Sequence, residues 1–191
     1  MKKKSSRRRT KIVRRSRKNL RRTIKRKNIR KSGRRPTRRY SRIQRGGEFE
    51  EEFKDTKMRA DNGDINAQND LGVMYENGEG VAQDYEKAME MYKLASAQGN
   101  ANAMNNMGVM YQNGLGVPQN YKFAVSYYQD AANSKNAEGQ NNLAGMYYNG
   151  YGIEKNMAKA LQLYRLAAAQ AHNLAIINLK AIEENEKKPN K

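Results

Sequence analysis

The chain repeats itself every 36 residues, and this periodicity limits its possible folds more than any other feature of the sequence. When the sequence is aligned on itself at that spacing, apolar, aromatic and glycine positions stay in register through three units. The columns include Leu71, Met107, Leu143 and Leu179; Tyr75, Tyr111 and Tyr147; Gly78, Gly114 and Gly150; and Ala88, Ala124 and Ala160. A period of this length is typical of a solenoid, in which each unit packs on its neighbours.

Each unit has the pattern of two helices joined by a short loop. In the first unit, Ala67, Leu71 and Tyr75 are four residues apart, which places them on one face of a helix. Gly78 can then adopt the left-handed conformation that ends helices, and Asp84 can cap the helix that follows. The tyrosines of both helices fall in the apolar stripes, so we expect them in the core. Because neither helix can bury its stripe alone, stacking of the units forms that core.

The sequence therefore predicts an all-α fold, a right-handed α/α superhelical solenoid preceded by a disordered basic tail. Phe49 aligns with Tyr85 when the register moves back by 36 residues, so a half-repeat helix covers the front of the stack. The predicted boundaries are a tail at 1–47, a capping helix at 48–63, repeats at 64–99, 100–135 and 136–171, a second capping helix at 172–186 and a disordered end at 187–191.

The repeated segments resemble those of a known family. They read LGVMYENGEGVAQDYEKAMEMY, MGVMYQNGLGVPQNYKFAVSYY and LAGMYYNGYGIEKNMAKALQLY. The NGxGV loop and the 36-residue period are similar to the Sel-1-like repeats, a branch of the tetratricopeptide-type solenoids, over about 60–180. The sequence departs from the pattern at Ala144, which replaces a glycine, and at Lys135 and Ala171, which replace the unit-ending Gly99. The resemblance implies an interaction scaffold, of the kind that serves in signalling, protein turnover and microbial host interaction.

The composition excludes several kinds of site. The chain has no Cys, so disulfides, Cys-ligated metals and thiol catalysis are excluded. Its one histidine, His172, cannot form a multi-His metal site. It shares a helix-start column with Asp64, where we expect a capping or surface histidine and not a catalytic one. We therefore expect no catalytic residue, no metal site and no cofactor. The resembled family also includes secreted, Cys-rich members with hydrolytic activity on β-lactams, and this chain does not look like that subset.

The first helix of each unit would line the concave face of such a solenoid. Polar residues recur there every 36 residues, and an Asn amide offers both a donor and an acceptor. The candidate partner-binding residues are Asn66, Asn69, Asp70, Asn102, Asn105, Asn106, Glu138, Asn141 and Asn142. Stacked one per repeat, the amides could hold the backbone of an extended peptide. The alternative is that these positions are simply solvated.

The N-terminal segment has the composition of a polyanion-binding tail. Residues 1–47 hold 24 of the 38 basic residues and no acidic one, whereas the remainder has a net charge of −5. Self-repulsion and scarce apolar surface predict that this segment is disordered. Arginine favours bidentate contact with phosphate, and the only aromatic residue, Tyr40, provides no base-stacking platform. The candidate polyanion-binding residues are Arg7, Arg8, Arg9, Arg14, Arg15, Arg17, Arg21, Arg22, Arg26, Arg34, Arg35, Arg38 and Arg39.

Two functional hypotheses follow from these features. In the first, the chain is a non-enzymatic adaptor that binds a protein or extended peptide on its repeats, and its tail binds nucleic acid without sequence specificity. In the alternative, the tail serves only for nuclear or organelle targeting, or contacts anionic membranes. No apolar run is long enough to span a membrane, and no secretory signal is evident. We expect an intracellular protein, in the nucleus or a virion, with the cytoplasm also open.

Overall fold

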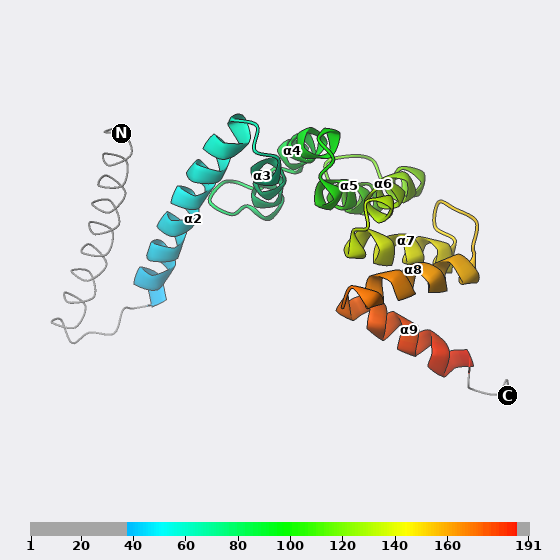
Figure 1. Cartoon of the computed structure of the whole chain (residues 1–191). Helices are drawn as coiled ribbons and strands as arrows, with labels where there is room; N and C mark the ends of the chain where they lie inside the picture. Colours follow the sequence, from blue (N-terminus) through cyan, green and yellow to red (C-terminus); the bar gives the residue numbers. More distant parts are fainter. Residues whose placement is uncertain (1–37, 187–191) are drawn as a thin grey trace, which may run out of the picture. The chain divides into compact units, whose positions relative to one another are not determined.

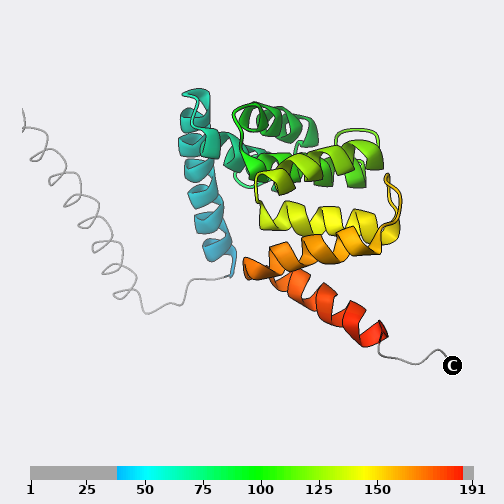
Figure 2. The same ribbon diagram turned by 45° about the vertical axis from the view of Figure 1, so that its right-hand side comes forward.

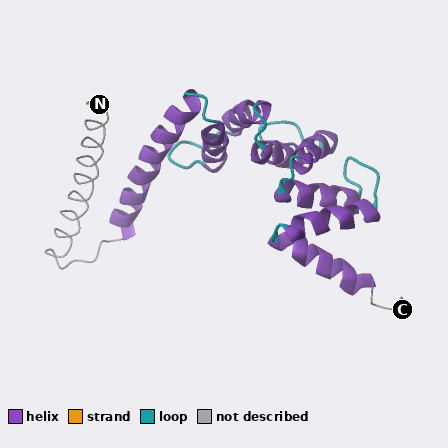
Figure 3. Cartoon of the chain, viewed as in Figure 1, coloured by secondary structure: helices purple, strands orange, loops and turns teal. Residues whose placement is uncertain are grey.

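The computed structural model describes residues 38–186, which form eight helices with no strand among them (Figures 1 and 3). The helices are α2 (Arg38–Asp61), α3 (Ile65–Asn77), α4 (Tyr85–Ala97), α5 (Ala101–Asn113), α6 (Tyr121–Asn133), α7 (Ala137–Asn149), α8 (Met157–Ala169) and α9 (Asn173–Glu186). The predicted all-α repeat fold is confirmed. The predictions of disorder at 1–37 and 187–191 lie outside the described residues.

Helix α2 begins earlier than predicted. It starts at Arg38, within the segment assigned to the tail, and not at residue 48. The prediction treated Gly46 and Gly47 as a boundary. A glycine inside a helix costs only about 1 kcal/mol relative to alanine, which is too little to end a helix by itself. The chain divides into two units near these glycines, and the second, residues 46–191, contains all the repeats.

The repeats form a stack in chain order. Helices α3, α5, α7 and α9 are the first helices of successive repeats, and α4, α6 and α8 are the second helices. Each helix from α3 to α9 packs against its neighbours in the sequence, and α5 also packs against α7. Figure 2 shows these helices side by side, in colours that run from teal to red. The core is therefore shared between adjacent repeats and does not belong to any one of them.

The ends of the first helices follow one pattern. At the start of α3, Oδ1 of Asp64 accepts a hydrogen bond at 3.0 Å from the backbone N–H three residues on, and Asn100 and Asn136 cap α5 and α7 in the same way. In α9 the equivalent bond, at 3.3 Å, goes to Nδ1 of His172, which confirms its predicted capping role. Gly78 ends α3 with a left-handed φ of 72°, as predicted.

The repeated apolar columns form the core. Leu71, Met107 and Leu143 are each at most 2% exposed. On the second helices, the tyrosine column of Tyr92, Tyr128 and Tyr164 is also buried. The tyrosine column of the first helices is half-buried in two of its three members. The prediction that the tyrosines belong to the core is confirmed for the column of Tyr92, Tyr128 and Tyr164.

The buried tyrosines require glycine on the facing helix. A Cβ added at Gly72 would lie 2.5 Å from Cε1 of Tyr92, and one at Gly108 would lie 2.5 Å from Cε1 of Tyr128. Such a separation is shorter than any carbon–carbon van der Waals contact. Each ring therefore packs directly on the backbone of its own first helix. In the third repeat this position is Ala144.

The turn between repeats passes through the left-handed region. Its residue has a φ of 85° at Gly63 and 87° at Gly99, but the same position is Lys135 in the next turn and Ala171 in the last, with φ of 60° and 61°. A residue with a Cβ costs roughly 1–2 kcal/mol more than glycine in this conformation. Lys135 and Ala171 therefore introduce backbone strain, which the alignment of the repeats did not reveal.

We predict that Lys135→Gly and Ala171→Gly each raise the free energy of unfolding by about 0.5–1 kcal/mol, because the relief of strain exceeds the added entropy of the unfolded chain. The reverse change, Gly99→Ala, should lower it by about 1 kcal/mol. A Cβ at Gly99 would contact nothing within 4 Å, so the effect is conformational only. Urea denaturation measures all three.

The matched control is Lys93→Gly, which makes the same replacement on an exposed residue inside α4. It should destabilise the protein by about 1 kcal/mol, opposite in sign to Lys135→Gly. Destabilisation by both lysine replacements would contradict the role assigned to the left-handed turn.

Candidate functional site

The nine predicted partner-binding residues lie on the first helices and differ in exposure. Four are exposed: Asn66, Asp70, Asn102 and Glu138. Two are half-buried: Asn106 and Asn142. Three are buried, with 8%, 1% and 8% of their surface exposed: Asn69, Asn105 and Asn141. The central column of the proposed amide ladder is therefore not accessible to a peptide, while binding by the exposed members stays a prediction.

The buried amides connect successive repeats. Nδ2 of Asn106 donates to Oδ1 of Asn69 at 3.2 Å. The same bond recurs along the stack: Asn142 to Asn105 at 2.9 Å, and Asn178 to Asn141 at 3.2 Å. A buried amide that lost its partner would be left unsatisfied at a cost of about 1–3 kcal/mol. The sequence analysis missed Asn178, although it shares the 36-residue column of Asn142.

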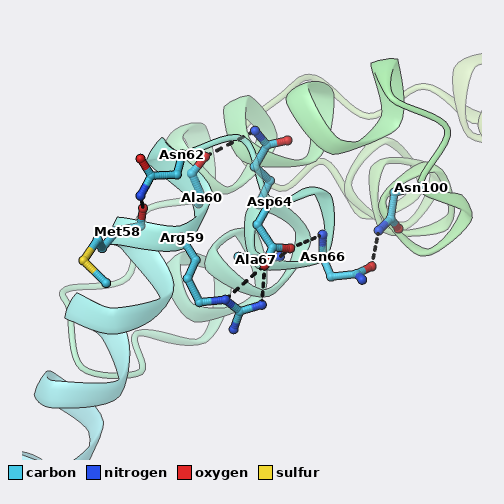
Figure 4. Close-up of polar contacts among 9 residues, drawn as sticks. Met58, Arg59, Ala60, Asn62, Asp64, Asn66, Ala67 and Asn100 are labelled. Atoms are coloured by element: carbon cyan, nitrogen blue, oxygen red, sulfur yellow. Dashed lines mark hydrogen bonds and ion pairs between the residues drawn. The ribbon is translucent and has the colours of Figure 1, made fainter. Parts of the chain in front are cut away.

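An ion pair joins α2 to the first repeat (Figure 4). Nη2 of Arg59 lies 2.6 Å from Oδ2 of Asp64, the residue whose other carboxylate oxygen caps α3. The hydrogen bond from the backbone N–H of Ala67 lowers the pKa of Asp64 the most, followed by the bond from Arg59. Beside this pair, Oδ1 of Asn66 accepts from Nδ2 of Asn100 at 3.3 Å. Asn66, a predicted binding residue, thus also links two repeats.

A cluster of three aromatic rings lies on the second repeat, and we call it the aromatic cluster: Tyr111, Phe123 and Tyr127. The ring centroids of Tyr111 and Tyr127 are 5.6 Å apart in a stacked arrangement, and those of Tyr111 and Phe123 are 5.2 Å apart in a tilted one. Phe123 is 53% exposed. The sequence analysis did not single out this cluster, because it considered each tyrosine column separately.

The neighbouring repeats have lysine where the aromatic cluster has Phe123. Lys87 places its Nζ 5.6 Å from the ring centroid of Tyr75, and Lys159 does so 5.2 Å from that of Tyr147. These cation–π contacts show that the fold accepts a lysine at this position. Packing therefore does not require the exposed Phe123 of the second repeat. Because Phe123 replaces the lysine of the other two repeats, it distinguishes the surface of the second repeat from theirs.

A second group of exposed apolar residues recurs at one repeat position on α2, α4 and α8. Met58 on α2, Leu94 on α4 and Leu166 on α8 share one column of the repeat and are each about half exposed. Asp130 takes the equivalent place on α6. The 36-residue register would have revealed this column, but the sequence analysis followed only the buried faces.

The described residues contain neither a metal-binding group nor a membrane-spanning helix. Between 38 and 186, no group of three or more His, Asp or Glu side chains is arranged to hold a metal ion. No helix in this part of the chain is long and apolar enough to cross a membrane. Of the thirteen predicted polyanion-binding arginines, only Arg38 and Arg39 fall within a described helix, and their side chains are not described.

Comparison with known proteins gives one consistent family. Residues 65–100, 101–136 and 137–172 match the model of the Sel1 repeat. Each matched repeat begins one residue later than the boundary chosen from the sequence and keeps the same period. A comparison with curated proteins gives no match.

Solved structures with the same architecture come from several bacteria. A protective antigen present in uropathogenic Escherichia coli strains, displaying an SLR fold, is 33% identical with a TM-score of 0.65, and the match covers 75% of this chain and 31% of that one. A Sel1 repeat protein from Oxalobacter formigenes is 31% identical with a TM-score of 0.64, covering 68% and 53%. The cysteine rich protein B of Helicobacter pylori, 24% identical with a TM-score of 0.52 and covering 65% and 94%, shares the fold. This chain thus spans about a third of the length of the first protein and about half of the length of the second.

We predict that Asp64→Asn makes thermal stability less sensitive to acid. The lowered pKa of Asp64 means that its ionised form is favoured by folding, so its contribution is present above about pH 4 and is lost as pH falls through the lowered value. The variant keeps the cap, as Asn100 and Asn136 do in their helices, but loses the charge. Melting temperatures measured from about pH 5 to pH 2.5 test this.

Asp130→Asn serves as the control, because Asp130 is exposed and takes part in no ion pair among the described residues. Equal acid sensitivity of the wild type and Asp64→Asn would contradict the prediction.

Proposed function

This chain belongs to the Sel1 repeat family, and on that basis we propose that it is a non-enzymatic scaffold that binds a partner protein through its repeats. Sel1 repeat proteins generally mediate protein–protein interaction, and the family is typically non-enzymatic. The proposal assigns partner binding to accessible side chains and not to the buried amide column.

The aromatic cluster is the observation that supports the proposal most directly. Phe123 exposes an apolar ring at a position where Lys87 and Lys159 show that a charged residue also fits. When a partner covers exposed apolar surface, the burial contributes about 25 cal/mol per Å² to the free energy of binding. Aromatic residues at the centre of an interface supply a large share of its binding energy. The half-exposed column of Met58, Leu94 and Leu166 offers further apolar contact on the second helices.

The proposal includes a separate role for the basic segment. Its charge and its arginine content favour binding to phosphates of DNA or RNA without sequence specificity. A scaffold with such a tail would bring its partner protein to nucleic acid, in the nucleus or in a virion. The alternative is that the tail acts only as a targeting signal or contacts anionic membranes.

We predict that Phe123→Lys weakens partner capture without unfolding the repeats. The lysine reproduces the contact that Lys87 and Lys159 make, so the fold should be retained. Affinity capture from lysate of the source cells, quantified by mass spectrometry, should show a loss of at least about tenfold for the specific partner, equivalent to 1.4 kcal/mol.

The control for this experiment is Phe49→Lys, which makes the same replacement on a 40% exposed phenylalanine of α2, outside the aromatic cluster. Partner capture should persist in this variant. Undiminished capture by Phe123→Lys, with circular dichroism equal to wild type, would contradict the assignment of the aromatic cluster.

We predict that the full chain binds labelled duplex DNA and single-stranded RNA with a steep salt dependence. If about 10 tail charges contact duplex phosphates, the slope of log K against log salt is roughly −9. Replacing the eleven candidate arginines between residues 7 and 35 by glutamine should flatten this slope and leave the repeats intact. Weak binding of the wild type near physiological salt would favour the targeting alternative instead.

A further inference from the structure

A pocket lies between the last three helices, and we call it the α7–α9 pocket. Its volume is about 250 Å³, and its lining residues are Tyr148, Asn149, Tyr164, Asn178, Ala181 and Ile182. Asn149 and Ala181 are exposed, so the pocket opens to solvent, whereas Tyr164 and Ile182 are buried. None of the nine predicted partner-binding residues lines it.

In the first two repeats, the tyrosine equivalent to Tyr164 packs on a glycine of its own first helix. The ring of Tyr92 lies against Gly72, and its hydroxyl donates to Oε2 of Glu76 at 2.5 Å. In the second repeat, the hydroxyl of Tyr128 donates to Oε1 of Gln112 at 2.8 Å. In both repeats the phenol therefore has an acceptor on its own first helix.

Three substitutions change this arrangement in the third repeat. Ala144 replaces the glycine, so its methyl group occupies the space that the tyrosine ring takes in the other repeats. Gly145 replaces a valine, and a Cβ added there would meet only the hydroxyl oxygen of Tyr164, at 3.6 Å. The hydroxyl end of Tyr164 therefore lies beside residue 145, where the first two repeats have a valine. Tyr148 replaces the Glu or Gln acceptor, and the Tyr164 hydroxyl makes no side-chain hydrogen bond in the described part of the chain.

The residues that line the pocket carry no charge, and Nζ of Lys155 lies 5.7 Å from the ring centroid of Tyr148. Tyr148 and Tyr164 provide two rings and two hydroxyls. Nδ2 of Asn178 is used by Asn141, at 3.2 Å, which leaves the carbonyl oxygen of Asn178 as an acceptor. Burial, followed by the proximity of Tyr148, raises the pKa of Tyr164, so its hydroxyl stays protonated and can donate. Ile182 adds an apolar surface.

The size of the pocket limits what it can hold. An apolar cavity of about 150 Å³ in another protein holds benzene, and pockets for drug-sized ligands start at about 300 Å³. A volume of about 250 Å³ lies between these values and fits one aromatic ring with a polar substituent. Aromatic pairs prefer offset or edge-to-face packing, which the two tyrosine rings could provide.

We infer that the α7–α9 pocket binds a phenol side chain, the tyrosine of a partner protein that docks on the repeats. The partner's ring would pack on Tyr148 and Ile182, and its hydroxyl would donate to the carbonyl oxygen of Asn178. The inference rests on the proposed scaffold function, but it assigns a different surface from the aromatic cluster. The two can therefore be tested independently.

The test uses the full chain and two probes, 4-fluorophenol and N-acetyl-tyrosine-methylamide. Fluorine and proton NMR titrations should show saturable binding of both probes to the wild type. The double variant Ala144→Gly with Gly145→Val restores the residue pair of the first two repeats, so Tyr164 should pack on residue 144 as Tyr92 packs on Gly72, which changes the wall of the pocket that Tyr164 forms. We expect this variant to bind both probes at least tenfold more weakly.

Two further variants make the result interpretable. Tyr151→Gln removes an exposed tyrosine outside the pocket and should bind as the wild type does. Ala181→Leu fills the mouth of the pocket from an exposed position and should weaken binding even if the double variant folds poorly.

Three outcomes would overturn the inference: no saturable binding to the wild type, unchanged binding by both pocket variants, or binding of 4-fluorophenol without the tyrosine derivative. The last would indicate a free small phenol as the ligand. None of these outcomes bears on partner capture through Phe123, so failure of the pocket and failure of the scaffold function are distinguishable.

Discussion

In the first two repeats, the stack depends on direct contact between a tyrosine ring of the second helix and the backbone of its own first helix. At Gly72 and Gly108 only the absence of a Cβ allows this approach. The contact fixes how closely the two helices of a repeat can lie, and it places the phenol hydroxyl beside an acceptor on the first helix. Burial of Tyr92 and Tyr128 raises the pKa of both phenols, so they remain neutral donors.

A second set of contacts fixes each repeat against the next. A Cβ at Gly116 would lie 2.8 Å from the backbone of Tyr85, so the loop of one repeat rests on the start of the preceding second helix. On the first helices, buried asparagines bridge the repeats through side-chain bonds such as Asn142 to Asn105. Unlike apolar packing, these bonds require one particular alignment, because a shifted helix would leave buried amides unsatisfied. Together the glycines and amides determine the register of the stack.

These contacts explain which parts of the structure could be predicted from the sequence. Periodicity within one helix revealed the helices, their caps and the buried column of Leu71, since those features depend on residues close in the chain. The role of Asn105 depends on Asn142, 37 residues away. A polar column with helical spacing resembles a solvated face until that distant partner is known. The early start of α2 at Arg38 was missed because paired glycines were given more weight than their energetic cost supports.

Repetition also changes how a functional surface can be recognised in such a chain. Where all repeats keep a residue, packing accounts for it, as for the buried tyrosine column of Tyr92, Tyr128 and Tyr164. Phe123 and the pair Ala144 and Gly145 depart from their columns, yet the helices around them are unchanged in length. A departure that adds nothing to packing, or that opens space, lowers stability unless something outside the repeat stabilises it. The first places an exposed ring on α6, and the second lies beside the hydroxyl of Tyr164, which lines a pocket at α9. Both are places where a bound molecule could restore the buried contacts that the other repeats make internally.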